Sequence, residues 1–232
     1  MYGIVTNRLR SLWVMALSVL AIIILSATTL WGTVIFEKWG GLILGAILML
    51  LAIPFHALLG KKSQIGYIIS FLLNTVGTGF NASAYYNCKS VCADLGAFLK
   101  ASFLAIIFLV ILGILLVPFK DKKHIFIGIF GCLEVAAIIM IIVCWVKYGG
   151  EYFAFALFSM VLCTFNTGVY AFTVDEEERG FFRDMSFGSY GYLIVVGLIA
   201  LAVISGGDAC DGCDCGCDGG DCGSGKKSKG KK

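Results

Sequence analysis

Four polar side chains recur on one helical face of an otherwise apolar segment. They follow one another at steps of four, three and four residues: Asn74, Thr78, Asn81 and Tyr85. This spacing places residues on the same face of an α-helix. Polar groups within an apolar helix line a path for a solute or ion, or they hydrogen-bond to a neighbouring helix and hold it in place. The spacing leaves both interpretations open.

The same steps return 85 residues later in the chain, at Ser159, Cys163, Asn166 and Tyr170. The offset carries the first three apolar segments onto the next three, which predicts repeats over residues 11–87 and 96–173. An odd number of spans in each unit makes the two units face opposite sides, as in many transporters. We therefore expect the two polar faces to line a shared path through Asn74, Thr78, Asn81, Ser159 and Asn166.

Glu134 is the only acidic residue deep inside a predicted span. A carboxylate there must be protonated, paired or in contact with water, because an unpaired charge in hydrocarbon is costly. We predict that it couples transport to an ion or proton; the alternative is a protonated side chain that bonds a backbone carbonyl. His56 lies near a predicted helix end beside Lys61 and Lys62, so we expect an interfacial side chain rather than a ligand or base.

The C-terminal tail contains half of the ten cysteines, at Cys-x-x-Cys and Cys-x-Cys spacings. Soft thiolates at such spacings favour Zn or Cu(I). The predicted ligands are Cys210, Cys213, Cys215, Cys217 and Cys222. A low-complexity extension that binds nothing specific and acylated cysteines beside the membrane are the alternatives. Cys88 and Cys92 form a further pair, but one pair at this spacing is not specific for any chemistry.

Hydrophobic residues make up 59% of the 232 residues and charged residues 14%, far from the balance of a soluble domain. The apolar runs are about 18 to 24 residues long, enough to cross a bilayer as helices. Seven such segments predict an all-α, polytopic membrane domain over residues 1–207. The predicted spans are 11–32, 40–60, 64–86, 101–119, 124–146, 150–173 and 187–205. Pro54 should bend the second span, and residues 208–232 form a disordered tail with a lysine-rich end.

Basic residues predict the orientation of these spans, because cytoplasmic loops are enriched in lysine and arginine. One side holds nine: Arg8, Arg10, Lys61, Lys62, Lys120, Lys122, Lys123, Arg179 and Arg183. The other side holds Lys38, Lys89, Lys100 and Lys147. The N-terminus is therefore expected in the cytoplasm, and seven spans place the tail outside. The five tail lysines would level the count, but they lie about twenty residues beyond the last span, where the bias fades.

The sequence contains no catalytic triad pattern, zinc-protease motif, phosphate-binding loop or dinucleotide fingerprint, so we do not expect an enzyme. The leading hypothesis is a transporter or channel for a small solute or ion. The alternative is a non-transporting scaffold or accessory protein with a metal-binding or docking tail. An intramembrane redox enzyme that uses Cys88 and Cys92 has the least support. The expected partners are the lipid bilayer, the solute and further copies of the chain in an oligomer; nucleic acid is not expected.

Overall fold

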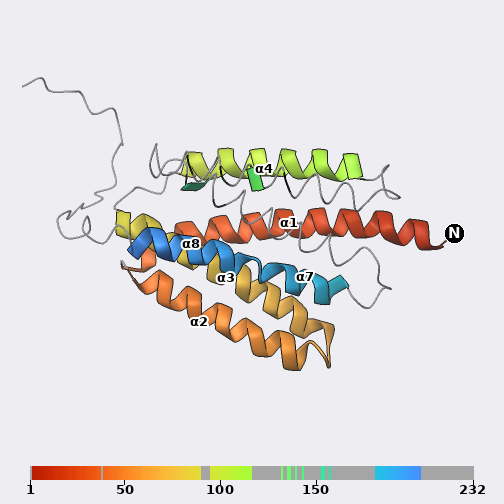
Figure 1. The fold of residues 1–232 in the computed structure, drawn as a ribbon, viewed down its shortest axis with the longest axis horizontal. Coiled ribbons are helices and arrows are strands. Elements are labelled where there is room, and N and C mark those ends of the chain that lie inside the picture. Colours follow the sequence, from red (N-terminus) through yellow and green to blue (C-terminus); the bar gives the residue numbers. More distant parts are fainter. Residues whose placement is uncertain are drawn as a thin grey trace, which may run out of the picture.

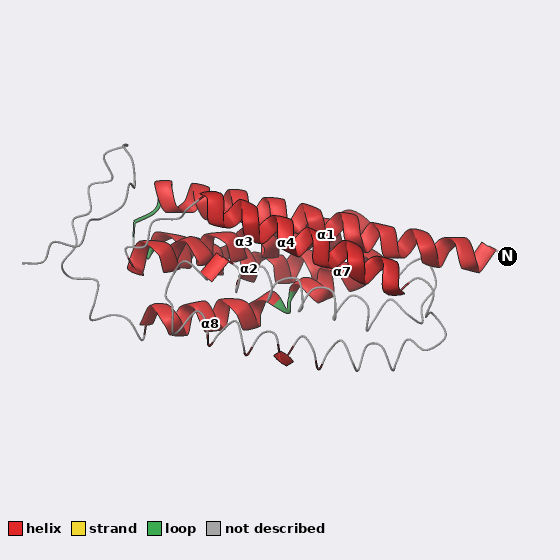
Figure 2. Cartoon of the chain, turned by 90° about the horizontal axis from the view of Figure 1, so that it is seen from above, coloured by secondary structure: helices red, strands yellow, loops and turns green. Residues whose placement is uncertain are grey.

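Every element in the described part of the chain is a helix. The computed structural model describes residues 2–37, 39–89, 95–116 and 181–204, with isolated helical positions at 132, 135, 136, 139, 143, 153, 154 and 157. The elements are α1 (Tyr2–Ile35), α2 (Gly40–Pro54), the π-helical turn η1 (Phe55–Leu59), α3 (Gln64–Lys89), α4 (Leu95–Leu116), α7 (Phe181–Ser189) and α8 (Tyr192–Ile204). Figure 2 shows these helices lying roughly lengthwise, with no strand among the residues it describes. The all-α prediction is confirmed for these residues.

Within the described residues, three segments are long and apolar enough to cross a membrane: Ala16–Ile35, Gly40–Leu59 and Phe182–Leu201. They correspond to the predicted first, second and seventh spans. The helix α3 has 26 residues, but it carries many polar side chains and is not among these three segments. The length and apolar composition of the three segments are those of membrane-spanning helices.

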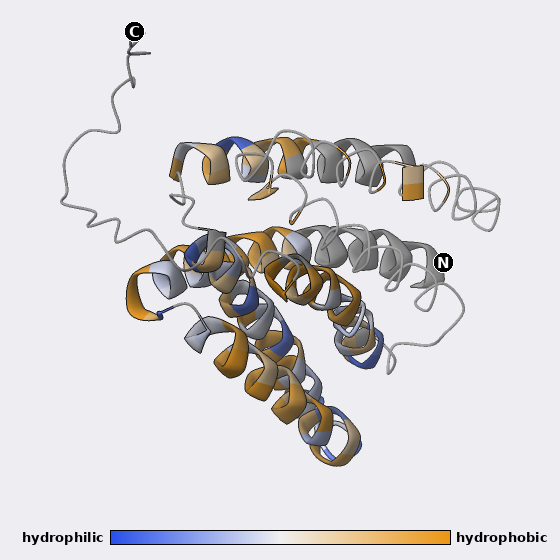
Figure 3. Cartoon of the chain, turned by 60° about the vertical axis from the view of Figure 1, so that its left-hand side comes forward, coloured by the Kyte–Doolittle hydropathy of each residue, from blue (hydrophilic) through white to orange (hydrophobic). Residues whose placement is uncertain are grey.

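The helix α3 contacts most of the other described helices. It packs against α1, α2, η1, α7 and α8, and Figure 1 shows it between α2 and the pair α7 and α8. Most of its polar residues are buried, whereas Ile43, Ile47 and Leu50 of α2 are exposed. In Figure 3 most of the α2 ribbon has the colour of hydrophobic residues. Polar groups that face protein while apolar groups face outward are the arrangement that a bilayer requires.

The helix changes type directly after Pro54, where a bend was predicted, and continues as the π-helical turn η1. Gly60 donates its backbone N–H to the carbonyl of Phe55 at 2.8 Å, a bond that spans five residues instead of four. Proline has no N–H to donate within the helix, which disturbs the regular ladder. The second span thus remains helical over Gly40–Leu59 but changes its type after Pro54.

Glycines allow α2 and α3 to approach closely. A Cβ placed on Gly45 would lie 2.5 Å from the carbonyl oxygen of Gly77 and 2.5 Å from Nδ2 of Asn81. A Cβ on Gly77 would lie 2.8 Å from the carbonyl oxygen of Gly45. Small residues at an interface permit such backbone contact in membranes. Gly45 and Gly77 thus bring the backbones of the two helices into contact.

The C-terminal apolar segment differs from the single predicted helix over 187–205. It begins at Phe181 and consists of two helices, α7 and α8, separated by a turn at Tyr190 and Gly191. The amides of Tyr190 and Gly191 bond to carbonyls only three residues back, at 3.0 Å each. Arg183, predicted in a loop, lies inside α7. The fourth predicted span also begins earlier, at Leu95 rather than at residue 101.

Candidate polar site at the helix break

The break between α7 and α8 lies against the polar face of α3. Asn74 of α3 donates from Nδ2 to Oγ of Ser189 at 2.8 Å, and Ser189 Oγ donates in turn to the carbonyl of Ser186 at 2.6 Å. Asn74 and Ser189 are both fully buried. The helix α3 is therefore joined to the last turn of α7 by a short chain of hydrogen bonds.

This chain determines the orientation of the Asn74 amide. Ser189 has a single hydroxyl hydrogen, which it donates to the Ser186 carbonyl, so it can only accept from Asn74. The amide must therefore present its NH2 group to Ser189. Its oxygen, Oδ1, is buried and has no hydrogen-bond partner among the described residues. A buried acceptor without a partner is costly, which marks this oxygen as a candidate ligand-binding atom.

Asn81 repeats this arrangement two turns further along α3. Its Nδ2 donates to the carbonyl of Gly77 at 2.8 Å and approaches the sulfur of Met49 at 3.7 Å. A backbone carbonyl can only accept, so the orientation of this amide is determined as well. Oδ1 of Asn81 is also buried and without a partner.

Thr78 lies between the two asparagines and donates to the carbonyl of Asn74 at 2.8 Å. We call Asn74, Thr78 and Asn81 the α3 polar row; all three residues are 0% exposed. The structure therefore places these predicted site residues on one face, in the interior of the described helices. The fourth residue of the pattern, Tyr85, stacks on Phe153, with ring centroids 4.0 Å apart.

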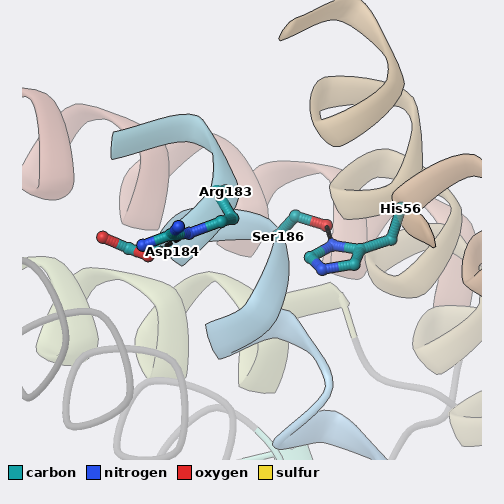
Figure 4. Close-up of polar contacts among 4 residues, drawn as sticks. All are labelled: His56, Arg183, Asp184 and Ser186. Carbon is teal, nitrogen blue, oxygen red and sulfur yellow. Dashed lines mark hydrogen bonds and ion pairs between the residues drawn. The ribbon is translucent and has the colours of Figure 1, made fainter. Parts of the chain in front are cut away.

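His56 was not predicted as a site residue, yet it joins the same cluster. Its Nδ1 lies 2.8 Å from Oγ of Ser186 (Figure 4). The rings of Tyr67 and Tyr190 lie edge-on to the imidazole, with centroid distances of 5.1 and 5.5 Å. The side chain is half-buried and packs between helices. Its partner is 130 positions away in the sequence, so no local spacing could have indicated the contact.

The pair of His56 and Ser186 has the separation of a base and a hydroxyl nucleophile. In the described part of the chain, no carboxylate hydrogen-bonds the second nitrogen of His56, so the orienting third group of a triad is lacking. Ser70 and Tyr190 extend the cluster, with their hydroxyl oxygens 3.2 Å apart. The arrangement is best described as a polar contact network that holds η1, α3 and α7 together.

No family model, curated protein or solved structure matches this chain. Function must therefore be inferred from the geometry of the polar site itself.

The helix α7, which carries Ser186, also contains an ion pair. Arg183 Nε is 3.3 Å from Oδ1 of Asp184 (Figure 4), and the Arg183 side chain is 47% exposed whereas that of Asp184 is 6% exposed. The exposed guanidinium thus offsets the charge of a nearly buried carboxylate. The sequence had placed both residues in a loop.

The remaining predicted site residues lie outside the described residues. They are Glu134, Ser159, Asn166 and the tail ligands Cys210, Cys213, Cys215, Cys217 and Cys222. The internal repeat and the metal site therefore stay predictions. Among the described residues, no three His, Cys, Asp or Glu side chains come together as a metal site.

Proposed function

We propose that this chain is a multi-pass membrane protein that moves a small solute or ion along a polar path through the membrane. The α3 polar row lines the described half of this path, and the predicted Glu134, Ser159 and Asn166 complete it. The observation that carries the proposal is the contact between Asn74 and the broken helix. Nδ2 of Asn74 donates a hydrogen bond to Ser189, while its Oδ1 is buried and has no partner among the described residues.

The position of the break supports this function. Tyr190 and Gly191 fall near the middle of the apolar segment Phe182–Leu201. Irregular backbone at membrane depth is tolerated where protein buries it or where it lines a water-filled cavity. Transporters place their solute sites at such discontinuous helices near the bilayer midplane. The break in α7 and α8 faces the polar side of α3, as this architecture requires.

The proposed architecture has seven spans, with two inverted units over 11–87 and 96–173 followed by the last span. The helices α1, α2 with η1, and α3 make up the first unit. The N-terminus lies in the cytoplasm and the tail outside, in accordance with the distribution of basic residues. The tail binds Zn or Cu(I) through its cysteines.

A second function, that of a non-transporting scaffold, is favoured by the contacts of Asn81. This residue donates to its own helix and lies at the close contact of Gly45 and Gly77. Amides and hydroxyls at such interfaces commonly stabilise helix packing. In that case the α3 polar row joins helices, and the tail is a docking or metal-binding appendage.

Flux through proteoliposomes distinguishes the two functions. We expect vesicles that contain the protein to pass at least one member of a panel of monovalent salts and small neutral osmolytes faster than protein-free vesicles. Asn74→Leu should abolish this flux, because it replaces the unpartnered oxygen with hydrocarbon. Ser83→Ala is the matched control, because Ser83 is buried on α3 and donates only to its own helix at Phe80.

Glu134→Gln tests the predicted coupling group in the same assay, and it should remove activity or its pH dependence. Vesicles that pass no member of the panel would contradict the transport function. An Asn74→Leu variant with unchanged flux would contradict a path along the α3 polar row. Variants that change only thermal stability would favour the scaffold.

A further inference from the structure

Three hydroxyl groups in or beside the α3 polar row donate their hydrogens to backbone carbonyls. Thr78 donates to the carbonyl of Asn74, and Ser189 donates to the carbonyl of Ser186. Thr75, also on α3, donates to the carbonyl of Phe71 at 2.9 Å. A hydroxyl has one hydrogen, so none of these three groups can donate to a ligand without first breaking a bond within the protein.

The two asparagines also turn their NH2 groups toward protein acceptors. Asn74 donates to Ser189 and Asn81 to the carbonyl of Gly77. The groups that remain along the row are oxygens. They are Oδ1 of the two asparagines, for which the described residues supply no partner, and Oγ1 of Thr78, which can still accept. The row therefore offers acceptors to a ligand, and a buried set of acceptors requires a partner that carries positive charge or hydrogens.

The charges around the row indicate a single positive charge. The row itself contains no acidic residue, and the nearly buried Asp184 pairs with Arg183. Sites for Ca²⁺ and Mg²⁺ use carboxylates, whereas neutral carbonyl oxygens suffice to replace the water shell of a monovalent ion. The basic side chains of Lys61, Lys62 and Lys100 are exposed, so these lysines do not occupy the acceptors.

The spacing of the acceptors suits an ion that moves in steps. Asn74 and Asn81 are separated by seven residues, or about 10 Å along the helix at ~1.5 Å per residue. Thr78 lies between them on the same face. Conduction requires several weak sites, because one tight site would trap the ion.

We propose that the α3 polar row binds a small monovalent cation, with Oδ1 of Asn74 and Oδ1 of Asn81 as two sites and Thr78 between them. This assignment rests on the proposed transport function and names its substrate class. Both amides act as ligands through oxygen, while Ser189 and the Gly77 carbonyl hold their NH2 groups away from the ion.

Thermal unfolding in different salts tests the proposal without a flux assay. Purified protein in lipid nanodiscs is unfolded in sodium or potassium chloride and, at equal concentration, in the chloride of bulky N-methyl-D-glucamine. We expect at least one of the two small cations to raise the unfolding temperature, because a ligand that binds only the folded state stabilises it. Exchange of chloride for gluconate at constant sodium should have no effect.

Variants of the row determine where the ion binds. Asn74→Ala should raise the half-saturating cation concentration about tenfold or more, whereas Asn74→Asp should lower it about tenfold by adding a charge, each corresponding to ~1.4 kcal/mol. Ser83→Ala should titrate as the unmodified protein does. If Asn74→Ala does not fold, Asn81→Ala and Asn74→Asp provide the decisive comparison.

The proposal is overturned if the bulky cation stabilises as well as sodium and potassium, if the effect follows chloride, or if the row variants titrate unchanged. Failure here is distinguishable from failure of the transport function. Flux without stabilisation by small cations would retain a path but refute this substrate class. Stabilisation without flux would retain the cation site and contradict transport.

Discussion

At the scale of single residues, hydrogen bonds determine how each polar side chain is directed. The hydrogen bond to Ser189 orients the amide of Asn74, and the hydrogen bond to the carbonyl of Gly77 orients that of Asn81. Because these neighbours accept from the NH2 groups, the amide oxygens are left as the acceptors that face away from them. This local chemistry converts a face of polar residues into a face of acceptors.

The contact between His56 and Ser186 should contribute measurably to stability. In a double-mutant cycle with His56→Ala and Ser186→Ala, we expect a coupling of about 1 kcal/mol, the range found for hydrogen bonds between membrane helices. Reversible unfolding in mixed micelles measures it. His56 and Ser26 make the control pair, because the two contacts of Ser26 lie on helices that do not carry His56. Ser26 donates to the carbonyl of Ile22 in α1, and its hydroxyl lies 3.3 Å from that of Ser102 in α4. Additive effects for His56 and Ser186 would show that their hydrogen bond contributes no stability.

At the scale of elements, a close backbone contact at Gly45 and Gly77 joins α2 to α3. Gly45→Ala should destabilise the protein by about 1–3 kcal/mol, because the added methyl group meets a backbone carbonyl and the Asn81 amide. Gly197→Ala is the matched control: no atom lies within 4 Å of its added Cβ. The control should be neutral or stabilising by up to about 1 kcal/mol, since alanine favours the helix. Equal effects of the two substitutions would exclude a close interface at Gly45.

The sequence predicted some of these elements well, and the reason is local. The second span was expected over 40–60 and is observed over Gly40–Leu59, because apolar content ends abruptly at Lys61 and Lys62. The shared face of Asn74, Thr78 and Asn81 follows from helical spacing alone. Both signals lie within one segment, where periodicity is informative.

Features that depend on distant contacts could not be predicted in this way. The contact of His56 with Ser186 joins residues far apart in the chain, and no composition signal indicates it. The break at Tyr190 and Gly191 was missed because the apolar run continues through it, and hydropathy does not distinguish one helix from two. The start of α7 was not predicted, because the charges of Arg183 and Asp184 suggested a loop.

At the scale of the whole molecule, the described helices place polar groups inside and apolar side chains outside. The helix α3 joins α1 and α2 to α7 and α8, which lie far from them in the sequence (Figure 1). The proposed second unit, with Ser159 and Asn166, would face the same break from the opposite orientation. We propose that water reaches the α3 polar row in the interior of these helices.

Labelling of single cysteines tests that claim most directly, because it needs no knowledge of the solute. Asn74→Cys, Ser189→Cys and Ser83→Cys are introduced separately into a chain that lacks the ten native cysteines. Each variant, in sealed vesicles of known orientation, is treated from either side with a charged, membrane-impermeant thiol reagent. We predict that positions 74 and 189 react from at least one side while position 83, packed near Gly32 and Gly41, stays protected. Protection of positions 74 and 189 from both sides, in protein that is folded, would contradict a path and leave the α3 polar row as a helix contact.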